Sequence, residues 1–370
     1  MLTVLWPPGW SPRCDNQRMN DDASGAHKKP RALLDSPAGD WRSILASASD
    51  AGYRGDQVAN WVFQHGVFRF ADMVNLPVGC REELSANYVV APPRVAARFE
   101  SVDGTRRFLL ELDDGLRVES VYMPYTDRVT LCISSQVGCR FACDFCQTGV
   151  GGLQRSLAPG EIVGQVLRLR AEQECLDRPV NVVFMGQGEP LDNVAAVIAA
   201  VRALQDPKGP GLGWRRITVS TVGVVTALRR LSEMGEARPR LAVSLNATTD
   251  EVRSAIMPIN RKWPIAELLG ALRRIPWRPR ERVTLEYVLL AGVNDTLEDA
   301  RRLGKLLHGI PAKVNLIPWN PLPTLPFGRP SPEHIERFRR AAREGGIDVL
   351  VRYSRGADIA AACGQLHTAG

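Results

Sequence analysis

Residues 131–148 read LCISSQVGCRFACDFCQT, and this stretch holds four of the eight cysteines of the 370-residue chain. Three of these four, Cys139, Cys143 and Cys146, follow the spacing C-x3-C-x2-C. Residues 128–133 alternate as a β-strand does, so the pattern predicts that the three thiols lie on the loop that leaves this strand. One short loop would then bring three thiolates to a single small inorganic centre.

Three cysteines are one fewer than most metal centres in proteins need. Structural zinc generally takes four nitrogen or sulfur ligands, and iron–sulfur clusters usually take four cysteines. None of the five histidines, at positions 27, 65, 308, 334 and 367, is near the loop in sequence. A [4Fe-4S] cluster held by three cysteines would leave one iron open to an outside ligand. A zinc site completed by a distant cysteine, or three structural thiols, stays open as the alternative at this point.

Composition and charge narrow the class of protein. A hydrophobic content of 45% and a charged content of 24% are ordinary for a globular chain. No run of about 18 apolar residues predicts a membrane span, and the opening residues lack the basic leader of a signal peptide. We therefore expect a cytoplasmic protein whose cysteines stay reduced. The net charge of +7 slightly favours a polyanionic partner such as nucleic acid.

Two groups of arginines could contact such a partner, or could equally be solvated faces of a helix and a strand. They are Arg215 and Arg216, and Arg273, Arg274, Arg278 and Arg280.

The sequence pattern divides the chain into four parts. Residues 1–38 lack periodicity and predict a disordered tail. Residues 39–92 have the three- and four-residue spacing of a small helical domain. Residues 93–127 predict a β-hairpin linker, and residues 128–366 alternate strands with helices. About six strand–helix units predict an α/β fold with a partial (β/α)6 barrel, fewer units than a complete eightfold barrel has.

Polar and glycine-containing clusters follow four of the predicted strands, where α/β barrels carry their active sites. These clusters span residues 185–190, 220–223, 244–247 and 315–320. Glycines 186 and 188 would allow a close approach of the backbone to a ligand, and Glu189 could hold a cation. Glu119 interrupts the apolar run 118–122. It is either a surface residue of an alternating strand or a buried general base with a raised pKa.

Several ordered motifs together resemble the RlmN/Cfr family of radical S-adenosylmethionine (SAM) RNA adenine methyltransferases. The resemblance covers about residues 40–366. The stretches that carry it include CISSQVGCRFACDFCQTG, FMGQGEPLDN, ITVSTVGVV, AVSLNATTDEVRSAIMPIN, LIPWNPLP and SRGADIAAACGQL. The resemblance implies a radical SAM barrel, a [4Fe-4S] cluster and SAM as cofactors, and an electron donor of the flavodoxin or ferredoxin type. It also implies an RNA substrate, namely 23S ribosomal RNA with transfer RNA as a further candidate, and a monomer away from the membrane.

The resemblance also implies a role for particular residues. Cys139, Cys143 and Cys146 would bind the cluster. Cys363 would take a methyl group from one SAM, and a radical made from a second SAM would activate that S-methyl group for addition to the electron-poor C2 carbon of adenine. Glu119 would accept the ring proton, and Cys132 would release the product by forming a disulfide with Cys363. The residues implied to hold SAM are Gly188, Glu189, Ser220, Ser244, Leu245, Asn246 and Asn320.

Two positions depart from the family pattern. Asn246 replaces the usual histidine, and Gln187 stands where methionine is common. The related branch of the family methylates C8 of adenine instead, and one sequence does not separate C2 from C8. A radical SAM enzyme of another outcome and a catalytically silent RNA-binding protein stay open as other functions. The presence of Cys132 and Cys363 argues against the first of these, and the complete cysteine motif argues against the second.

Overall fold

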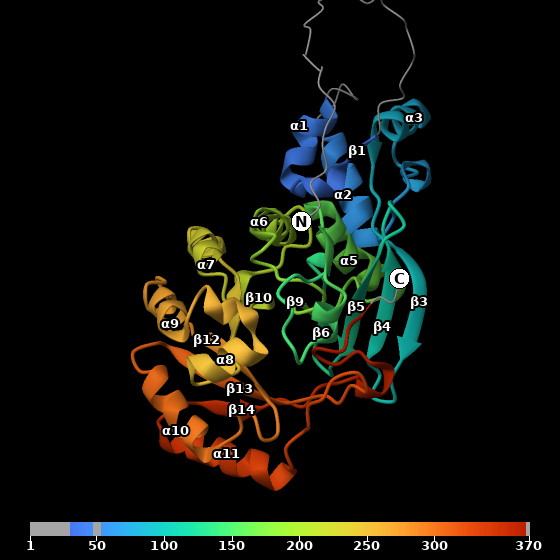
Figure 1. The fold of residues 1–370 in the computed structure, drawn as a ribbon. Helices are drawn as coiled ribbons and strands as arrows, with labels where there is room; N and C mark the ends of the chain where they lie inside the picture. Colours follow the sequence, from blue (N-terminus) through green and yellow to red (C-terminus); the bar gives the residue numbers. More distant parts are fainter. Residues whose placement is uncertain (1–29, 47–52, 368–370) are drawn as a thin grey trace, which may run out of the picture.

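One ten-stranded sheet runs through the main part of the molecule (Figure 1). The structure is a computed structural model, and it describes residues 30–46 and 53–367. The spatial order of the strands is β14-β13-β12-β11-β10-β9-β6-β5-β4-β3. Their bounds are β3 Arg94–Glu100, β4 Arg106–Glu111, β5 Arg117–Pro124, β6 Val129–Cys132, β9 Val180–Phe184, β10 Ile217–Thr221, β11 Arg240–Ser244, β12 Val283–Leu289, β13 Ala312–Pro318 and β14 Val349–Val351.

The part of the sheet from β6 to β14 is parallel throughout. Helices connect consecutive strands, so the predicted partial (β/α)6 barrel is confirmed, with β14 as a short additional strand. The helices of this part are α4 Gln147–Val150, α5 Pro159–Glu172, α6 Val194–Gln205, α7 Val225–Ser232, α8 Asp250–Ile256, α9 Ile265–Arg273, α10 Leu297–Leu306 and α11 Pro332–Glu344. Parallel strands need such crossovers, and the helices cover one face of the sheet.

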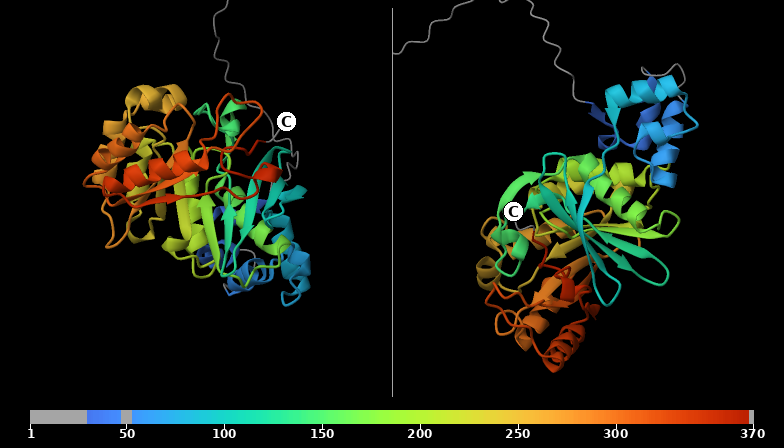
Figure 2. Two further views of the ribbon diagram at one scale, coloured as in Figure 1. Left: turned by 90° about the horizontal axis from the view of Figure 1, so that it is seen from below. Right: turned by 90° about the vertical axis from the view of Figure 1, so that its right-hand side faces the viewer.

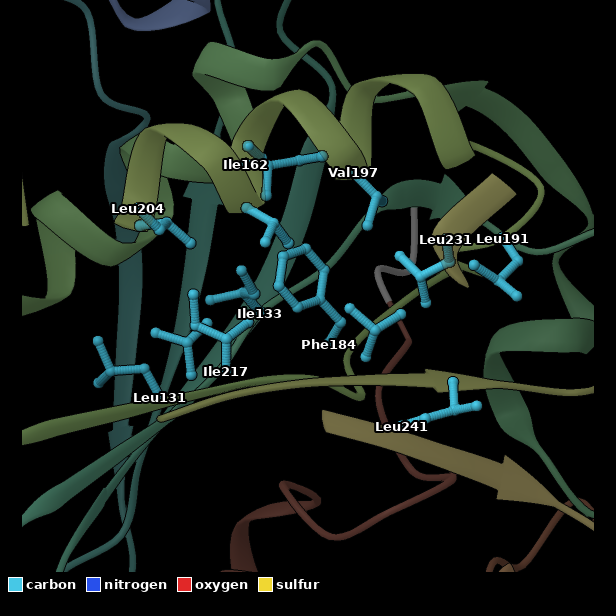
Figure 3. Packing of buried hydrophobic residues seen from close by; sticks show 14 of the residues in the cluster. Leu131, Ile133, Ile162, Phe184, Leu191, Val197, Leu204, Ile217, Leu231 and Leu241 are labelled. Carbon is cyan, nitrogen blue, oxygen red and sulfur yellow. The ribbon is translucent and has the colours of Figure 1, made fainter. Parts of the chain in front are cut away.

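Alternation along the strands explains how the two faces differ. In β12, Val283, Leu285, Tyr287 and Leu289 are fully buried among the helices, while the residues between them face the inside of the barrel. Figure 3 shows the helical side, where side chains of α5 and α6 pack onto residues such as Ile133 and Phe184. Each buried aliphatic side chain of this kind contributes about 1.5–3 kcal/mol to the stability of the fold.

The segment predicted as a hairpin linker is a three-stranded extension of the main sheet. Strands β3, β4 and β5 pair antiparallel with one another, and β5 continues onto β6. A register shift between Val95 and Ala97 marks a bulge in β3. The C-terminal segment after β14 returns to this region and lies beside β4–β6, as the red trace near these strands shows (Figure 1).

The helical domain near the N-terminus sits at one end of the sheet (Figure 2). Its elements are α1 Trp41–Leu45, α2 Arg54–His65, α3 Val78–Asn87 and the two-stranded sheet of β1 Arg31–Ala32 and β2 Tyr88–Val89. Gly55 lets α2 approach α1, because a Cβ atom there would lie 2.5 Å from the Arg42 nitrogen. The domain docks onto the barrel through the Asp35 Oδ1 atom, which accepts a hydrogen bond from the Gly160 nitrogen (2.8 Å).

The prediction of a disordered tail over residues 1–38 includes residues that are ordered in the structure. Residues 1–29 lie outside the described residues, but residues 30–38 include β1 and a 3-10 turn at Leu33–Asp35. Leu33 and Leu34 are buried against the barrel helices. Two apolar side chains that pack in the core give this part of the segment a fixed position, which its mixed composition concealed. Within the described residues, no helix is both long and apolar enough to cross a membrane.

Candidate active site

A cavity of about 160 Å³ opens at the carboxyl ends of the parallel strands. Six of the seven residues implied to hold SAM line it, together with Cys146 and Cys363. The six are Gly188, Glu189, Ser220, Ser244, Asn246 and Asn320. These residues come from loops far apart in sequence, and the parallel sheet brings them to one rim.

Leu245 is the exception among these residues. Its side chain is fully buried in the hydrophobic core and does not line the cavity. Its backbone groups form hydrogen bonds within the protein. The Leu245 nitrogen donates to the backbone oxygen of Glu286 (3.0 Å), and the Leu245 oxygen accepts from Arg253 Nε (3.0 Å). The side chain of Leu245 therefore faces the core, since the alternation that turns Ser244 and Asn246 inward turns Leu245 outward, and a contact between Leu245 and SAM stays a prediction.

The turn after β9 packs tightly against the segment that follows β6. A Cβ atom at Gly186 would lie 2.7 Å from the backbone of Ile133, and one at Gly188 would lie 2.5 Å from Gln136 Cβ. Gly188 also has a φ of 96°, which favours glycine. Both glycines thus serve close backbone packing that forms the cavity wall.

Glu189 is buried in this turn and is held from two sides. Its Oε1 atom accepts a hydrogen bond from the Leu191 nitrogen (2.9 Å), and its Oε2 atom accepts from the Val222 nitrogen (2.8 Å). Burial raises the pKa of Glu189 to about 7, although the hydrogen bonds from Thr221, Val222 and Leu191 oppose the rise. Glu189 therefore ties the ends of β9 and β10 together, and its carboxylate keeps lone pairs for a ligand.

Asn246 has a structural role that its sequence pattern did not indicate. Its φ is 55°, a left-handed conformation that asparagine tolerates better than most residues. Its Oδ1 atom accepts a hydrogen bond from the Val288 nitrogen (2.8 Å), and its backbone oxygen accepts from Asn294 Nδ2 (2.6 Å). The residue thus joins the end of β11 to β12.

We expect Asn246→Ala to lower the free energy of unfolding by about 1–3 kcal/mol, because the buried Val288 nitrogen loses its acceptor and alanine is strained at positive φ. Urea unfolding checks this value. Asn246→Gly serves as the control. It loses the same hydrogen bond, but glycine adopts the positive φ at this position without strain. Unchanged stability of the alanine variant, together with lost SAM binding, would instead make Asn246 purely a ligand contact.

The three cysteines of the C-x3-C-x2-C motif lie on a loop closed by a hairpin. Strand β7 (Gln136–Gly138) pairs antiparallel with β8 (Leu153–Ser156), so residues 139–152 form a loop between them. The Cys139 nitrogen donates to the Gly152 oxygen (2.8 Å), and the Cys146 nitrogen donates to the Cys143 oxygen (3.0 Å). The motif therefore follows the strand at residues 129–132, as predicted. A short hairpin that was not predicted closes the loop.

The electrostatics of the three thiols indicate that they lie near one another in an apolar setting. Burial raises the pKa of Cys139 to about 12 and raises the pKa values of Cys143 and Cys146. The Cys146 thiol further raises the pKa values of Cys139 and Cys143, and the Cys363 thiol further raises that of Cys146. Among the described residues, no three His, Cys, Asp or Glu side chains are grouped to hold a single metal ion. A cluster that takes one thiolate on each of three irons needs no such close grouping. Binding of a positively charged iron centre would stabilise the thiolates that burial disfavours.

A second, smaller cavity of about 30 Å³ lies beside the first, on the side of β5 and β6. Cys132, at the end of β6, and Cys363 both line it. Cys363 also lines the larger cavity, so its position joins the two. Both thiols are free in the structure. Burial raises the pKa of Cys132 to about 12, with the charge of Arg352 opposing the rise.

Several hydrogen bonds hold the segment around Cys363 across the cavities. Asn320 Nδ2 donates to the Cys363 oxygen (3.1 Å), and the Gln147 nitrogen donates to the Gly364 oxygen (2.8 Å). Thr148 Oγ1 donates to the Leu366 oxygen (2.7 Å). Two of these donors lie directly after the last cysteine of the motif, so the cysteine loop and the Cys363 segment are fastened together.

Glu119 on β5 is 1% exposed, which rules out the surface alternative. Its carboxylate pairs with Arg107 and accepts a hydrogen bond from the His367 nitrogen (2.7 Å). Burial raises the pKa of Glu119, while the Arg107 charge opposes the rise. Glu119 lines neither cavity, but it shares its face of β5 with Val121, which borders the smaller one.

The sequence interpretation missed two charged residues at this site, of which one is half-buried and the other is buried. Arg352 follows β14 and lines the smaller cavity, and Glu286 lies on β12 and lines the larger one. Glu286 interrupts the apolar run 283–290 as Glu119 interrupts its own run. The same signal could therefore have found it.

The arginine groups considered for RNA lie at the other ends of the strands. Arg215 and Arg216 precede β10, and Arg278 and Arg280 precede β12. Arg278 Nη2 donates to the backbone oxygens of Glu236 (2.7 Å) and Arg238 (2.8 Å), so it stabilises local structure. The cavities open at the carboxyl ends, so these arginines are not placed to hold RNA over them.

Comparison with known proteins gives consistent matches along the chain. Residues 133–304 match the radical SAM superfamily, and residues 32–90 match the N-terminal domain of ribosomal RNA large subunit methyltransferases. A dual-specificity RNA methyltransferase RlmN of Anaeromyxobacter dehalogenans is 47% identical over 95% of this chain and 94% of its own length. The enzyme of the same name from Geobacter sulfurreducens is 50% identical over 85% of this chain and 86% of its own.

A solved structure agrees with these sequence matches. The crystal structure of a radical SAM methyltransferase from Sphaerobacter thermophilus is 43% identical and has a TM-score of 0.87. The match covers 91% of this chain and 99% of that one. The likeness thus extends over nearly the whole chain.

Proposed function

Because this chain belongs to the RlmN family of radical SAM enzymes, we propose that it methylates the C2 carbon of adenine in RNA by way of an S-methylcysteine at Cys363. The observation that carries this proposal is the position of Cys363 between two cavities. One cavity has the features of a SAM site, and the other contains Cys132. A sulfur that receives a methyl group on one side and delivers it on the other needs such a position.

The enzyme uses a [4Fe-4S] cluster and SAM, and the residues of the larger cavity fit this pair. Cys139, Cys143 and Cys146 would hold the cluster on their hairpin-closed loop. Glu189 and Asn320 would face SAM from opposite strands of the rim. When bound, the reduced cluster and SAM supply the one-electron chemistry that activates the S-methyl group. A reductant of the flavodoxin or ferredoxin type would deliver the electron.

Cys363, Cys132 and Glu119 would carry the protein's own steps. The Cys363 sulfur accepts a methyl group, because the C2 carbon of adenine is too electron-poor to attack SAM directly. Glu119 accepts the proton of the ring carbon. The Cys132 sulfur then bonds to the Cys363 sulfur while the bond from that sulfur to the bridging carbon breaks. The carbon keeps the electron pair of the broken bond and takes up a proton, so it stays on the RNA as a methyl group. The Cys132 thiol gives up its own proton, and the two cysteines end as a disulfide.

Aromatic and basic side chains at the edge of the smaller cavity support an RNA substrate. Tyr353 is 58% exposed and lies beneath Arg329, and Arg128 and Arg355 stack on the ring of Tyr125. Tyrosine and arginine planes accept unpaired bases by stacking. We propose ribosomal RNA as the substrate, with transfer RNA as the second, and a cytoplasmic monomer that meets both there.

Methylation of RNA with the purified holoenzyme tests this function. The RNA is digested to nucleosides, which are separated and weighed by mass spectrometry, and we expect 2-methyladenosine. With SAM that carries a CD3 group, passage through a bridging carbon leaves two deuterium atoms on the product methyl group, whereas direct transfer leaves three. Formation of 8-methyladenosine would assign the chain to the other branch, and an unmodified RNA with active SAM cleavage would reject both.

The charge of Arg107 should influence the pH below which the methylation rate falls. Glu119 acts as a base only when ionised, and Arg107 lowers its pKa against the effect of burial. We therefore expect Arg107→Gln to move the acid side of the pH–rate profile to higher pH. Single-turnover methylation of RNA by enzyme that already carries S-methyl-Cys363 measures this profile.

Arg94→Gln is the matched control for this prediction. Arg94 forms an exposed ion pair with Glu111 (2.6 Å) in the same sheet extension, away from Glu119. The pH–rate profile of Arg94→Gln should be the same as that of the wild-type protein, because an exposed ion pair has little influence on the pKa of a buried group. A shift of the Arg107→Gln profile to lower pH would contradict the role of Glu119 as the base.

A further inference from the structure

Glu286 is a buried carboxylate on the inner face of the barrel. It lies in β12 between Leu285 and Tyr287, which point into the hydrophobic core. Alternation therefore turns Glu286 toward the inside of the barrel, where it lines the larger cavity beside Ser244 and Val288. Only 6% of the residue is exposed.

One oxygen of this carboxylate lacks a protein partner. Oε1 accepts a hydrogen bond from Asn315 Nδ2 (3.2 Å), whereas Oε2 has no hydrogen-bond partner within the described part of the chain. Burial raises the pKa of Glu286, and the charges of Arg352 and Lys313 oppose the rise. Neither cation comes within the 4.0 Å of a direct ion pair in the described residues. Buried polar atoms in folded proteins nearly always have a partner, so this oxygen indicates a ligand that donates.

The place of Glu286 in the sheet limits which part of a ligand it meets. The cysteine loop and Glu189 flank the cavity from the side of β6 and β9. Strand β12 lies three strands beyond β9 in the sheet order, after β10 and β11. In radical SAM enzymes, the superfamily that residues 133–304 match, the amino and carboxylate groups of SAM bind the open iron, so this end of SAM would lie at the cysteine loop. The nucleoside end, with its two ribose hydroxyl groups, would then extend toward β12. A carboxylate that accepts from ribose hydroxyls is a recurring arrangement in nucleotide sites.

We propose that Glu286 is a further SAM-binding residue whose free carboxylate oxygen accepts hydrogen bonds from the ribose hydroxyl groups. This inference rests on the proposed SAM site and adds a residue to it. Asn315 holds the other oxygen and fixes the orientation of the carboxylate. The charges of Arg352 and Lys313 favour the ionised form of the carboxyl group against the effect of burial, and neither side chain forms a direct ion pair with the free oxygen.

Binding of nucleosides that lack the amino-acid chain tests the inference without turnover. 5′-Deoxyadenosine and its analogues without the 2′- or the 3′-hydroxyl group are titrated into the holoenzyme by calorimetry. We expect the wild-type protein to bind at least one of the two analogues roughly 10- to 100-fold more weakly, the range of a hydrogen bond to a charged group. Glu286→Gln should bind 5′-deoxyadenosine more weakly and distinguish the three ligands much less.

The outcomes separate this inference from the function on which it rests. Equal affinity of the wild-type protein for all three ligands would overturn the role of Glu286, whatever the variant does. Full discrimination retained by Glu286→Gln would also overturn it, because another residue would then contact the hydroxyls. No binding of 5′-deoxyadenosine to wild-type protein would reject the cavity as a SAM site altogether. Iron content and thermal unfolding of Glu286→Gln establish that the variant is folded, and Glu286→Asp, which keeps the charge on a shorter side chain, should recover part of the discrimination.

Discussion

Replacing Cys132 with alanine is expected to trap the protein on its RNA. Cys363 would still receive its methyl group and still form the carbon bridge to adenine, because its own surroundings are intact. The bridge could not be resolved, since Cys132 is the only other thiol that lines the smaller cavity in the described structure. Protein of raised mass should accumulate, and nuclease treatment should reduce the added mass to that of a short nucleotide remnant. Free methylated RNA should fall by several orders of magnitude.

Cys363→Ala should fail in a different way. Without a sulfur to accept the methyl group, this variant should form neither methylated RNA nor a cross-link. Cys175→Ala is the matched control, because Cys175 is, like Cys132, a buried free cysteine, but it lines neither cavity. Cross-linked RNA on Cys363→Ala, or a normal yield of free product from Cys132→Ala, would overturn the two roles.

The parallel sheet and the rim of the larger cavity could be predicted from the sequence because both follow from local patterns. A near-continuous apolar strand such as residues 180–184 indicates burial on both faces, and the polar cluster after it marks the carboxyl end of the strand. When several such strands run parallel, their ends meet without further information. The fold class alone therefore placed Gly188, Glu189 and Ser220 at a ligand-binding rim, whereas their role in holding SAM came from the resemblance to the family.

The remainder of the site depends on contacts between distant segments, which no local pattern encodes. The Cys363 segment is held by Asn320, and Glu119 is covered by the backbone of His367, 248 residues later in the chain. Leu245 was predicted to hold SAM because the family motif covers residues 244–246 without a break. In the structure, the side chain of this middle residue points into the hydrophobic core and away from the cavity. Pairing across the sheet also turned a predicted linker hairpin into part of the main sheet.

Losing any one cysteine of the C-x3-C-x2-C motif is expected to abolish both cleavage of SAM and methylation of RNA. Three thiolates already leave one iron without a protein ligand, so Cys139→Ala, Cys143→Ala or Cys146→Ala leaves two irons without one. The loop cannot compensate, because the β7–β8 hairpin and the bond from the Cys139 nitrogen to the Gly152 oxygen fix its ends. Formation of 5′-deoxyadenosine under dithionite, with iron and sulfide content, measures the loss.

The comparison with the other cysteine variants makes this prediction specific. Cys132→Ala and Cys363→Ala remove thiols that border the site but leave the motif complete, so both should keep their iron and still cleave SAM. Cys146 is the most demanding case, because it lines the larger cavity and its neighbour Gln147 is bonded to the Cys363 segment. Its loss should disturb the cluster and that segment together, whereas loss of Cys139 should disturb the cluster alone. Wild-type formation of 5′-deoxyadenosine by any of the three motif variants would reject the assignment of these cysteines to the cluster.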